Sequence, residues 1–141
     1  MYLKSLAVKN FRNHEAVKYN FSNKMNIFTG PNGVGKTNLV EAIYYLSLAR
    51  SFRTTDDDEL IRYGQFQAHI DAKVMLGEVS HMIKVLFTPE GRKIIIDNKP
   101  VHKLSELSSL VNIILFEPKD VMLFRGLPKE RRNYLDIFIS K

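Results

Sequence analysis

The chain has 141 residues, 45% of them hydrophobic, which is enough to bury the core of one ordinary domain. It contains no cysteine, so disulfides and thiolate metal sites are excluded, and no apolar run reaches the ~20 residues of a membrane-spanning helix. Its net charge of +6 suits a polyanionic partner without requiring one. Because the first residues lack the apolar region of a signal peptide, we expect a cytoplasmic protein with no membrane association.

The first 48 residues predict two strands, a third short strand and a helix. Residues 2–11 and 14–21 are expected to form a hairpin, because apolar and polar residues alternate in the second segment. Residues 25–29 are a short apolar run that predicts a buried strand. Residues 36–48 carry apolar side chains along one face of a helix.

The segment between the buried strand and this helix fits the phosphate-binding pattern G-x-x-x-x-G-K-[ST] at Gly30, Gly35, Lys36 and Thr37. Glycines let backbone N–H groups approach phosphate oxygens, and the helix start adds its own N–H groups and positive dipole end. Lys36 is expected to reach the β- and γ-phosphates, and Thr37 to offer its hydroxyl to Mg²⁺. The alternative is a glycine-rich turn that caps an ordinary helix, but the order strand, loop, helix favours a nucleoside triphosphate site.

Two groups of polar residues could be read as metal ligands. The acidic run 56–59 follows Thr54 and Thr55, and this pattern favours a helix N-terminus, where negative charge is stabilised by the macrodipole. The histidines lack the paired spacing of a metal site; they are His14, His69, His81 and His102. Neither group is expected to bind a metal.

The middle of the chain predicts antiparallel strands. Every second residue from 66 to 76 is apolar, which indicates a long half-buried strand, and the chain turns near Gly77 and returns through residues 83–87. A second hairpin is expected around residues 97–100.

The last third predicts short elements. Residues 105–110 and 118–124 favour short helices, and residues 111–116 form an apolar run of β type. Pro128 is expected to start a final helix, 129–139. No internal repeat or long linker suggests a second complete domain.

A phosphate loop that supports hydrolysis usually works with a second apolar strand that ends in an acidic residue. The candidates are Asp97, which lies in an expected hairpin turn, and Glu117, which precedes a proline; both positions argue against a catalytic role. We therefore expect this chain alone to bind nucleotide with little or no turnover.

The chain resembles the head domains of the SMC and RecF families, the ABC-type ATPases that act on DNA. The resemblance rests on Lys9-Asn10-Phe11-Arg12 and on Gly-Pro-Asn-Gly-Val-Gly-Lys-Thr-Asn in the loop. The RecF family is the nearer of the two, through residues 41–47, 51–54, 116–120 and 126–136.

This resemblance implies an α/β fold, namely the N-terminal part of one ABC-type P-loop ATPase head. Its mixed sheet, with antiparallel hairpins, would pack around the phosphate-loop helix. Residues 1–141 would belong to this head, with the signature motif, the second acidic nucleotide motif and a coiled-coil-like lobe beyond the chain end.

The implied function is a bacterial DNA replication and repair protein with slow ATP hydrolysis. It would dimerise around ATP, bind single-stranded, double-stranded or gapped DNA, and load recombinase with the mediators RecO and RecR, in recombinational repair, replication restart and the SOS response.

The resemblance also implies a set of site residues. Arg12 matches a nucleotide-contacting position and Arg53 an arginine expected near the γ-phosphate or DNA, although both could equally be solvated surface charges. The loop residues that match the family's ATP site are Gly30, Pro31, Asn32, Gly33, Val34, Gly35, Lys36, Thr37 and Asn38.

Four basic residues are candidates for contacts with DNA phosphates, or else for simple solvation of the surface: Lys4, Lys9, Arg131 and Arg132. Two other functions share a phosphate loop, the nucleotide-binding subunit of a membrane transporter and a small-molecule kinase. The stretches shared with the RecF family favour the DNA-acting head over both.

Overall fold

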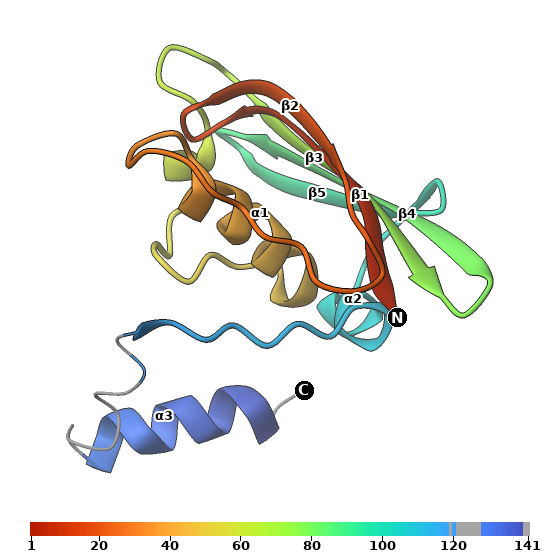
Figure 1. Ribbon diagram of the computed structural model, residues 1–141, viewed down its shortest axis with the longest axis vertical. Helices are drawn as coiled ribbons and strands as arrows, with labels where there is room; N and C mark the ends of the chain where they lie inside the picture. The colour runs from red at the N-terminus through yellow and green to blue at the C-terminus, as the bar shows by residue number, and fades with distance from the viewer. Residues whose placement is uncertain (119, 121–127, 140–141) are drawn as a thin grey trace.

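The computed structural model describes residues 1–118, 120 and 128–139. Its main element is a six-stranded antiparallel sheet with the order β2-β1-β3-β4-β5-β6. The strands are β1 (Tyr2–Phe11), β2 (His14–Asn20), β3 (Ala68–Leu76), β4 (Val79–Thr88), β5 (Gly91–Ile96) and β6 (Lys99–Pro100). The helices are α1 (Lys36–Leu48), the 3₁₀ helix η1 (Asp57–Leu60), α2 (Leu104–Leu110) and α3 (Pro128–Ile139). Helix α1 covers one face of the sheet (Figure 1).

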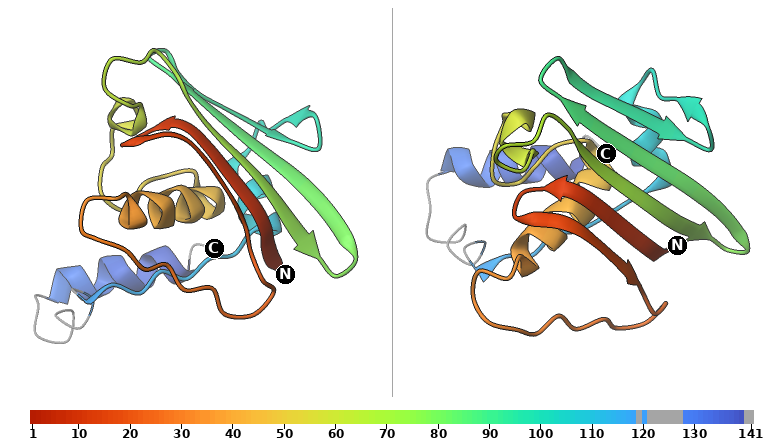
Figure 2. Two further views of the ribbon diagram at one scale, coloured as in Figure 1. Left: turned by 45° about the horizontal axis from the view of Figure 1, so that its top comes forward. Right: turned by 90° about the horizontal axis from the view of Figure 1, so that it is seen from above.

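Alternation of apolar and polar residues determines which side of each strand is buried. In β3, Ala68, Ile70, Ala72 and Val74 are buried, whereas the residues between them are partly exposed. The predicted hairpins are confirmed, with β3 starting two residues later than expected. The result is a mixed α/β structure in which one sheet face packs against α1 and the other remains uncovered by described helices (Figure 2).

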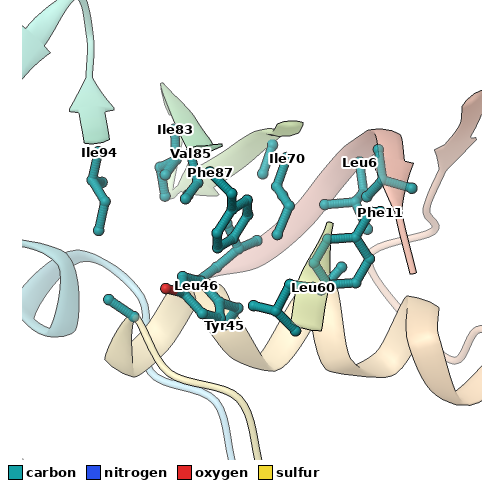
Figure 3. Close-up of a cluster of buried hydrophobic side chains, with 14 of the residues drawn as sticks. Leu6, Phe11, Tyr45, Leu46, Leu60, Ile70, Ile83, Val85, Phe87 and Ile94 are labelled. Carbon is teal, nitrogen blue, oxygen red and sulfur yellow. The ribbon is translucent and has the colours of Figure 1, made fainter. Parts of the chain in front are cut away.

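Aromatic rings join α1 to the sheet. The ring of Tyr45 on α1 lies 4.9 Å from the ring of Phe87 on β4, edge to face, and Phe87 lies 6.0 Å from Phe11 on β1. Figure 3 shows Tyr45 and Phe87 pointing toward each other between the helix and the sheet, and all three residues are fully buried. This contact fixes the helix that follows the phosphate loop.

The acidic run forms η1, and its cap differs from the prediction. The carboxylate of Asp56, rather than a threonine, accepts the N–H of Asp58 at 3.0 Å. Asp57 accepts the hydroxyl of Tyr45 at 2.9 Å and pairs with Arg92 on β5. Burial and then the charge of Asp57 raise the pKa of the Tyr45 hydroxyl. The run therefore links α1 to the sheet.

Two predicted strands are absent. Residues 25–29 have no regular secondary structure, and Met25 and Ile27 are 80% and 76% exposed. Residues 111–116 do not join the six-stranded sheet either, and Ile114 and Phe116 are exposed. An apolar run indicates a tendency to be buried, but a strand also needs a neighbour in a hydrogen-bonded ladder, which a single segment does not specify.

The C-terminal helices agree with the prediction where the structure describes them. Helix α2 begins at Leu104, one residue before its predicted start, and α3 begins at Pro128. The predicted helix 118–124 falls mainly outside the described residues. Within the described residues, no helix is long and apolar enough to cross a membrane.

We expect Phe87→Ala to lower the free energy of unfolding by about 3–5 kcal/mol, because it leaves a cavity between Phe11 and Tyr45. Urea unfolding followed by circular dichroism measures the change. Leu86→Ala is the matched control, since Leu86 lies on the opposite side of β4 and is only partly buried, so its loss should be smaller. Equal losses for the two variants would contradict this account of the core.

Candidate functional site

The phosphate loop connects residue 29 to helix α1, and its shape depends on glycine. Gly33 and Gly35 have φ of 86° and 99°, a left-handed region that other residues rarely adopt, and Gly30 has φ of 150°. The helix begins at Lys36, immediately after Gly35. The first N–H groups of α1 therefore open onto the loop, as a phosphate site requires.

The turn between β1 and β2 holds the loop from one side. The side-chain amide of Asn13 donates to the carbonyl of Gly33 at 2.9 Å, and its carbonyl oxygen accepts from Asn38 at 2.8 Å. The ring nitrogen Nε2 of His14 lies 3.1 Å from the carbonyl oxygen of Gly35. A Cβ at Gly35 would collide with the His14 ring and with Asn13, so only glycine fits there. Hairpin and loop thus form one packed unit.

Lys36 lies along the loop that precedes it. Its ammonium group donates to the carbonyls of Gly30 and Pro31, at 2.7 Å and 2.6 Å. Thr37 is exposed in the first turn of α1, directly after Lys36. A backbone cradle with a lysine and a hydroxyl beside it suits the phosphates of ATP with Mg²⁺.

Two arginines meet at a buried carboxylate beside the loop. Arg12 donates to both oxygens of Glu41, from Nε at 2.9 Å and from Nη2 at 2.6 Å, a bidentate pair. Arg53 donates from Nη1 to Asn38 at 2.7 Å and to Glu41 at 3.2 Å. The hydroxyl of Ser51 also donates to Glu41, at 2.5 Å. The structure therefore places both predicted arginines next to the phosphate loop.

Glu41 is fully buried, yet it remains ionised. Burial alone would raise its pKa, but the hydrogen bonds from Arg12 and Ser51 and the charges of Arg12 and Arg53 outweigh burial and hold the pKa below its ordinary value. A buried charge of this kind is stable only when it is paired. Its role is to hold the two guanidinium groups in place.

An open cleft of about 700 Å³ adjoins the loop. One side is formed by the polar residues just described, and the other by the connection that follows η1, including the fully exposed Tyr63. The lining residues are Arg12, Asn13, Asn38, Arg53, Glu59, Ile61, Arg62 and Tyr63. The cleft is therefore bordered by three arginines and one acid, which favours an anionic ligand.

The other predicted residues lie elsewhere. Lys4 is at an irregularity of β1, Lys9 is on the sheet face opposite α1, and Arg131 and Arg132 are exposed on α3. Asp97 lies in the β5–β6 turn, where its carboxylate accepts the N–H of Met82 and pairs with His81, so it links this turn to β4. Within the described residues, no cluster of three or more His, Asp or Glu side chains could hold a metal.

The sequence pattern alone did not identify Asn13, His14, Glu41 and Ser51 as site residues. One signal was present: Glu41 is an acid between Leu39 and the apolar residues of the buried helix face. Acidic residues are almost never fully buried unless they are paired, so this position predicts a basic partner for Glu41.

Comparison with known sequences identifies relatives along nearly the whole chain. The model of the RecF/RecN/SMC N-terminal domain family matches residues 2–120. The DNA replication and repair protein RecF of Lactobacillus johnsonii is 44% identical over 97% of this chain and 37% of its own length. RecF of Chlamydia trachomatis is 42% identical over 97% of this chain and 38% of its own length. The chain thus spans less than two fifths of these relatives.

Solved structures show the same relationship. A structure of the recombination mediator protein RecF with ATPrS, from the RecFOR pathway, is 31% identical and has a TM-score of 0.91, covering 99% of this chain and 38% of that one. The SMC head domain of Thermotoga maritima is 22% identical with a TM-score of 0.58, covers 77% of this chain and 41% of that one, and supports the fold alone. The chain therefore has the fold of an ATPase head and belongs to the RecF/RecN/SMC N-terminal domain family, on its RecF branch.

Proposed function

We propose that residues 1–141 are the N-terminal part of one ABC-type ATPase head and bind ATP with Mg²⁺ through Gly30–Asn38. The observation that carries this proposal is the phosphate loop, whose left-handed glycines are braced by Asn13 and His14 and whose Lys36 lies along it. A Cβ at Gly35 does not fit, so the cradle is formed by backbone groups. This is the arrangement that suits phosphate oxygens best.

Each residue of the loop has a distinct task in this proposal. ATP would supply the phosphates, and Mg²⁺ would neutralise part of their charge. Lys36, whose ammonium group donates to Gly30 and Pro31, would hold the phosphates, and the hydroxyl of Thr37 would be a ligand for Mg²⁺. The N-terminal N–H groups of α1 add a fixed positive field.

The two arginines have different tasks because they are bound differently. Arg12 uses both guanidinium edges on Glu41 and the carbonyl of Glu59, and its side chain is 17% exposed, so it supplies positive potential from a fixed place. Arg53 is 41% exposed and shares one nitrogen between Asn38 and Glu41. We assign Arg53 the contact with the terminal phosphate.

The proposed function of the whole protein follows its family. It is an ATP-dependent homodimer in the cytoplasm that binds DNA and helps load recombinase at gaps with RecO and RecR, in repair, replication restart and the SOS response. Support comes from the relatives, which are named DNA replication and repair proteins, and from the RecFOR pathway of the solved homologue. The same relatives disfavour a transporter subunit or a small-molecule kinase. Arg131 and Arg132 stay candidates for DNA contacts.

We expect Lys36→Ala to weaken the binding of ATP and ADP by about 10- to 100-fold, since it removes charge-assisted hydrogen bonds to phosphate. Thr37→Ala should instead reduce the dependence of affinity on Mg²⁺. Calorimetry on the purified chain measures both effects. Lys24→Ala, which removes an exposed charge outside the site, is the control. Equal affinities for the wild type and Lys36→Ala would exclude the role given to Lys36.

Arg53→Ala should weaken ATP binding by about tenfold while leaving ADP binding unchanged, because only ATP carries the terminal phosphate. Arg50→Ala removes the same charge from an exposed position three residues earlier and should change neither affinity. The measurement is the ratio of ATP to ADP dissociation constants for each variant. An equal loss of affinity for ATP and ADP would show that Arg53 does not contact the terminal phosphate.

The chain alone should release little or no phosphate from ATP. Of the described carboxylates considered for this role, Glu41 is committed to its arginines and Asp97 to the β5–β6 turn, so neither is free to position the attacking water. A steady-state phosphate assay with Lys36→Ala as background tests this. Turnover that requires Mg²⁺ and Lys36 would mean that a carboxylate of this chain acts in catalysis.

A further inference from the structure

The face of the sheet opposite α1 carries most of the net charge of the chain. In the right view of Figure 2, this face is turned toward the viewer, and α1 and α3 lie behind the sheet. The strand register aligns the residues of this face in three rows that cross the strands. The first row is Ala16, Lys9, His69, Leu86 and Lys93; the second is Lys18, Ala7, Asp71, Lys84 and Ile95; the third is Asn20, Ser5, Lys73 and Met82.

These rows contain five lysines and one acid, Asp71, a net charge of +4 out of the +6 of the whole chain. We call this surface the lysine face and define it by Lys9, Lys18, Lys73, Lys84 and Lys93. In the described part of the chain, none of these lysines forms an ion pair. Arg12, Arg53, Arg62 and Arg92, by contrast, are all paired with carboxylates.

The dimensions of the lysine face suit a double helix. Lys9 and Lys93 are three strands apart in one row, and so are Lys18 and Lys84 in the next, which is about 14 Å at the usual strand spacing. A duplex carries one charge per ~1.7 Å of axis, so about eight phosphates occupy that length, and about half of them face the protein. The five lysines of the face are comparable in number with these roughly four phosphates.

The chemistry of the face favours a duplex backbone over single strands. The three rows contain no Phe, Tyr or Trp on which unpaired bases could stack. Small residues separate the lysines on β1 and β2, namely Ser5, Ala7 and Ala16, so a broad rigid ligand can approach the sheet. Lysine binds phosphate as a point charge, and contacts to phosphate carry no sequence information.

We propose that the lysine face is a binding surface for the phosphate backbone of duplex DNA, without sequence preference. The inference rests on the proposed DNA-binding function and assigns it to a surface other than α3. Because the face lies on the side of the sheet opposite α1, DNA and nucleotide occupy opposite sides of the same sheet.

The test compares the full-length protein, wild type and Lys84→Ala/Lys93→Ala, on a 30-base-pair duplex, by fluorescence anisotropy across a salt series, with and without ATP and Mg²⁺. Two lost phosphate contacts should reduce the slope of log K against log salt by about 1.8 and the affinity at 0.1 M salt by at least about tenfold. Lys24→Ala/Arg50→Ala, which removes the same charge from exposed positions outside the face, should leave both quantities near wild type.

A second variant acts in the opposite direction. Asp71 is the only acid in the three rows and lies across from Lys84, so Asp71→Asn should raise the affinity for the duplex. A folding defect would not increase affinity, so this variant separates electrostatics from loss of structure. Thermal unfolding of each variant provides the check that the sheet is intact.

The outcomes separate this inference from the proposed function. If the Lys84→Ala/Lys93→Ala variant binds duplex as tightly as the wild type, the lysine face is not the DNA surface. If only Arg131→Ala/Arg132→Ala loses affinity for duplex, the DNA surface is α3. Binding to anionic phospholipid vesicles but not to duplex would assign the face to a membrane surface. Full-length wild type that binds no DNA under any condition would overturn the proposed DNA binding itself.

Discussion

The bidentate pair between Arg12 and the buried Glu41 determines how the parts of this structure fit together. Arg12 lies at the turn between β1 and β2, Glu41 lies in α1, and Ser51 and Arg53 lie in the segment that follows. One carboxylate therefore joins three segments of the chain, and its bidentate partner Arg12 lies 29 residues before it. Loss of Arg12 would leave the buried carboxylate with only Ser51 and Arg53 as partners, and an incompletely paired buried charge destabilises a fold.

The positive charges of the chain are divided between two tasks. Arginine makes the partly buried ion pairs around the phosphate loop and the helix, because its planar guanidinium group can bond two carboxylate oxygens at once. Lysine occupies the outer sheet face, where its flexible stem and strongly hydrated ammonium group remain in water. The charged groups on one side of the sheet are therefore held in fixed positions, whereas those on the other side can move.

Local patterns predicted the elements but not their partners. Alternation in β3 and the glycine pattern at Gly30, Gly33 and Gly35 are properties of short segments, so hairpins and phosphate loop followed from the sequence. The bond from Asn13 to Gly33 spans 20 residues, and no local pattern encodes it. Residues 25–29 failed as a strand for the same reason, because pairing depends on segments elsewhere in the chain.

The contact between His14 and Gly35 determines where the proton of the imidazole resides. A carbonyl oxygen only accepts hydrogen bonds, so at 3.1 Å from the Gly35 oxygen the Nε2 atom of His14 must carry the hydrogen. The neutral ring is then the Nε2–H tautomer for as long as the loop keeps this shape. Because the two tautomers differ in their nitrogen-15 chemical shifts, this ring is a built-in spectroscopic reporter of loop conformation.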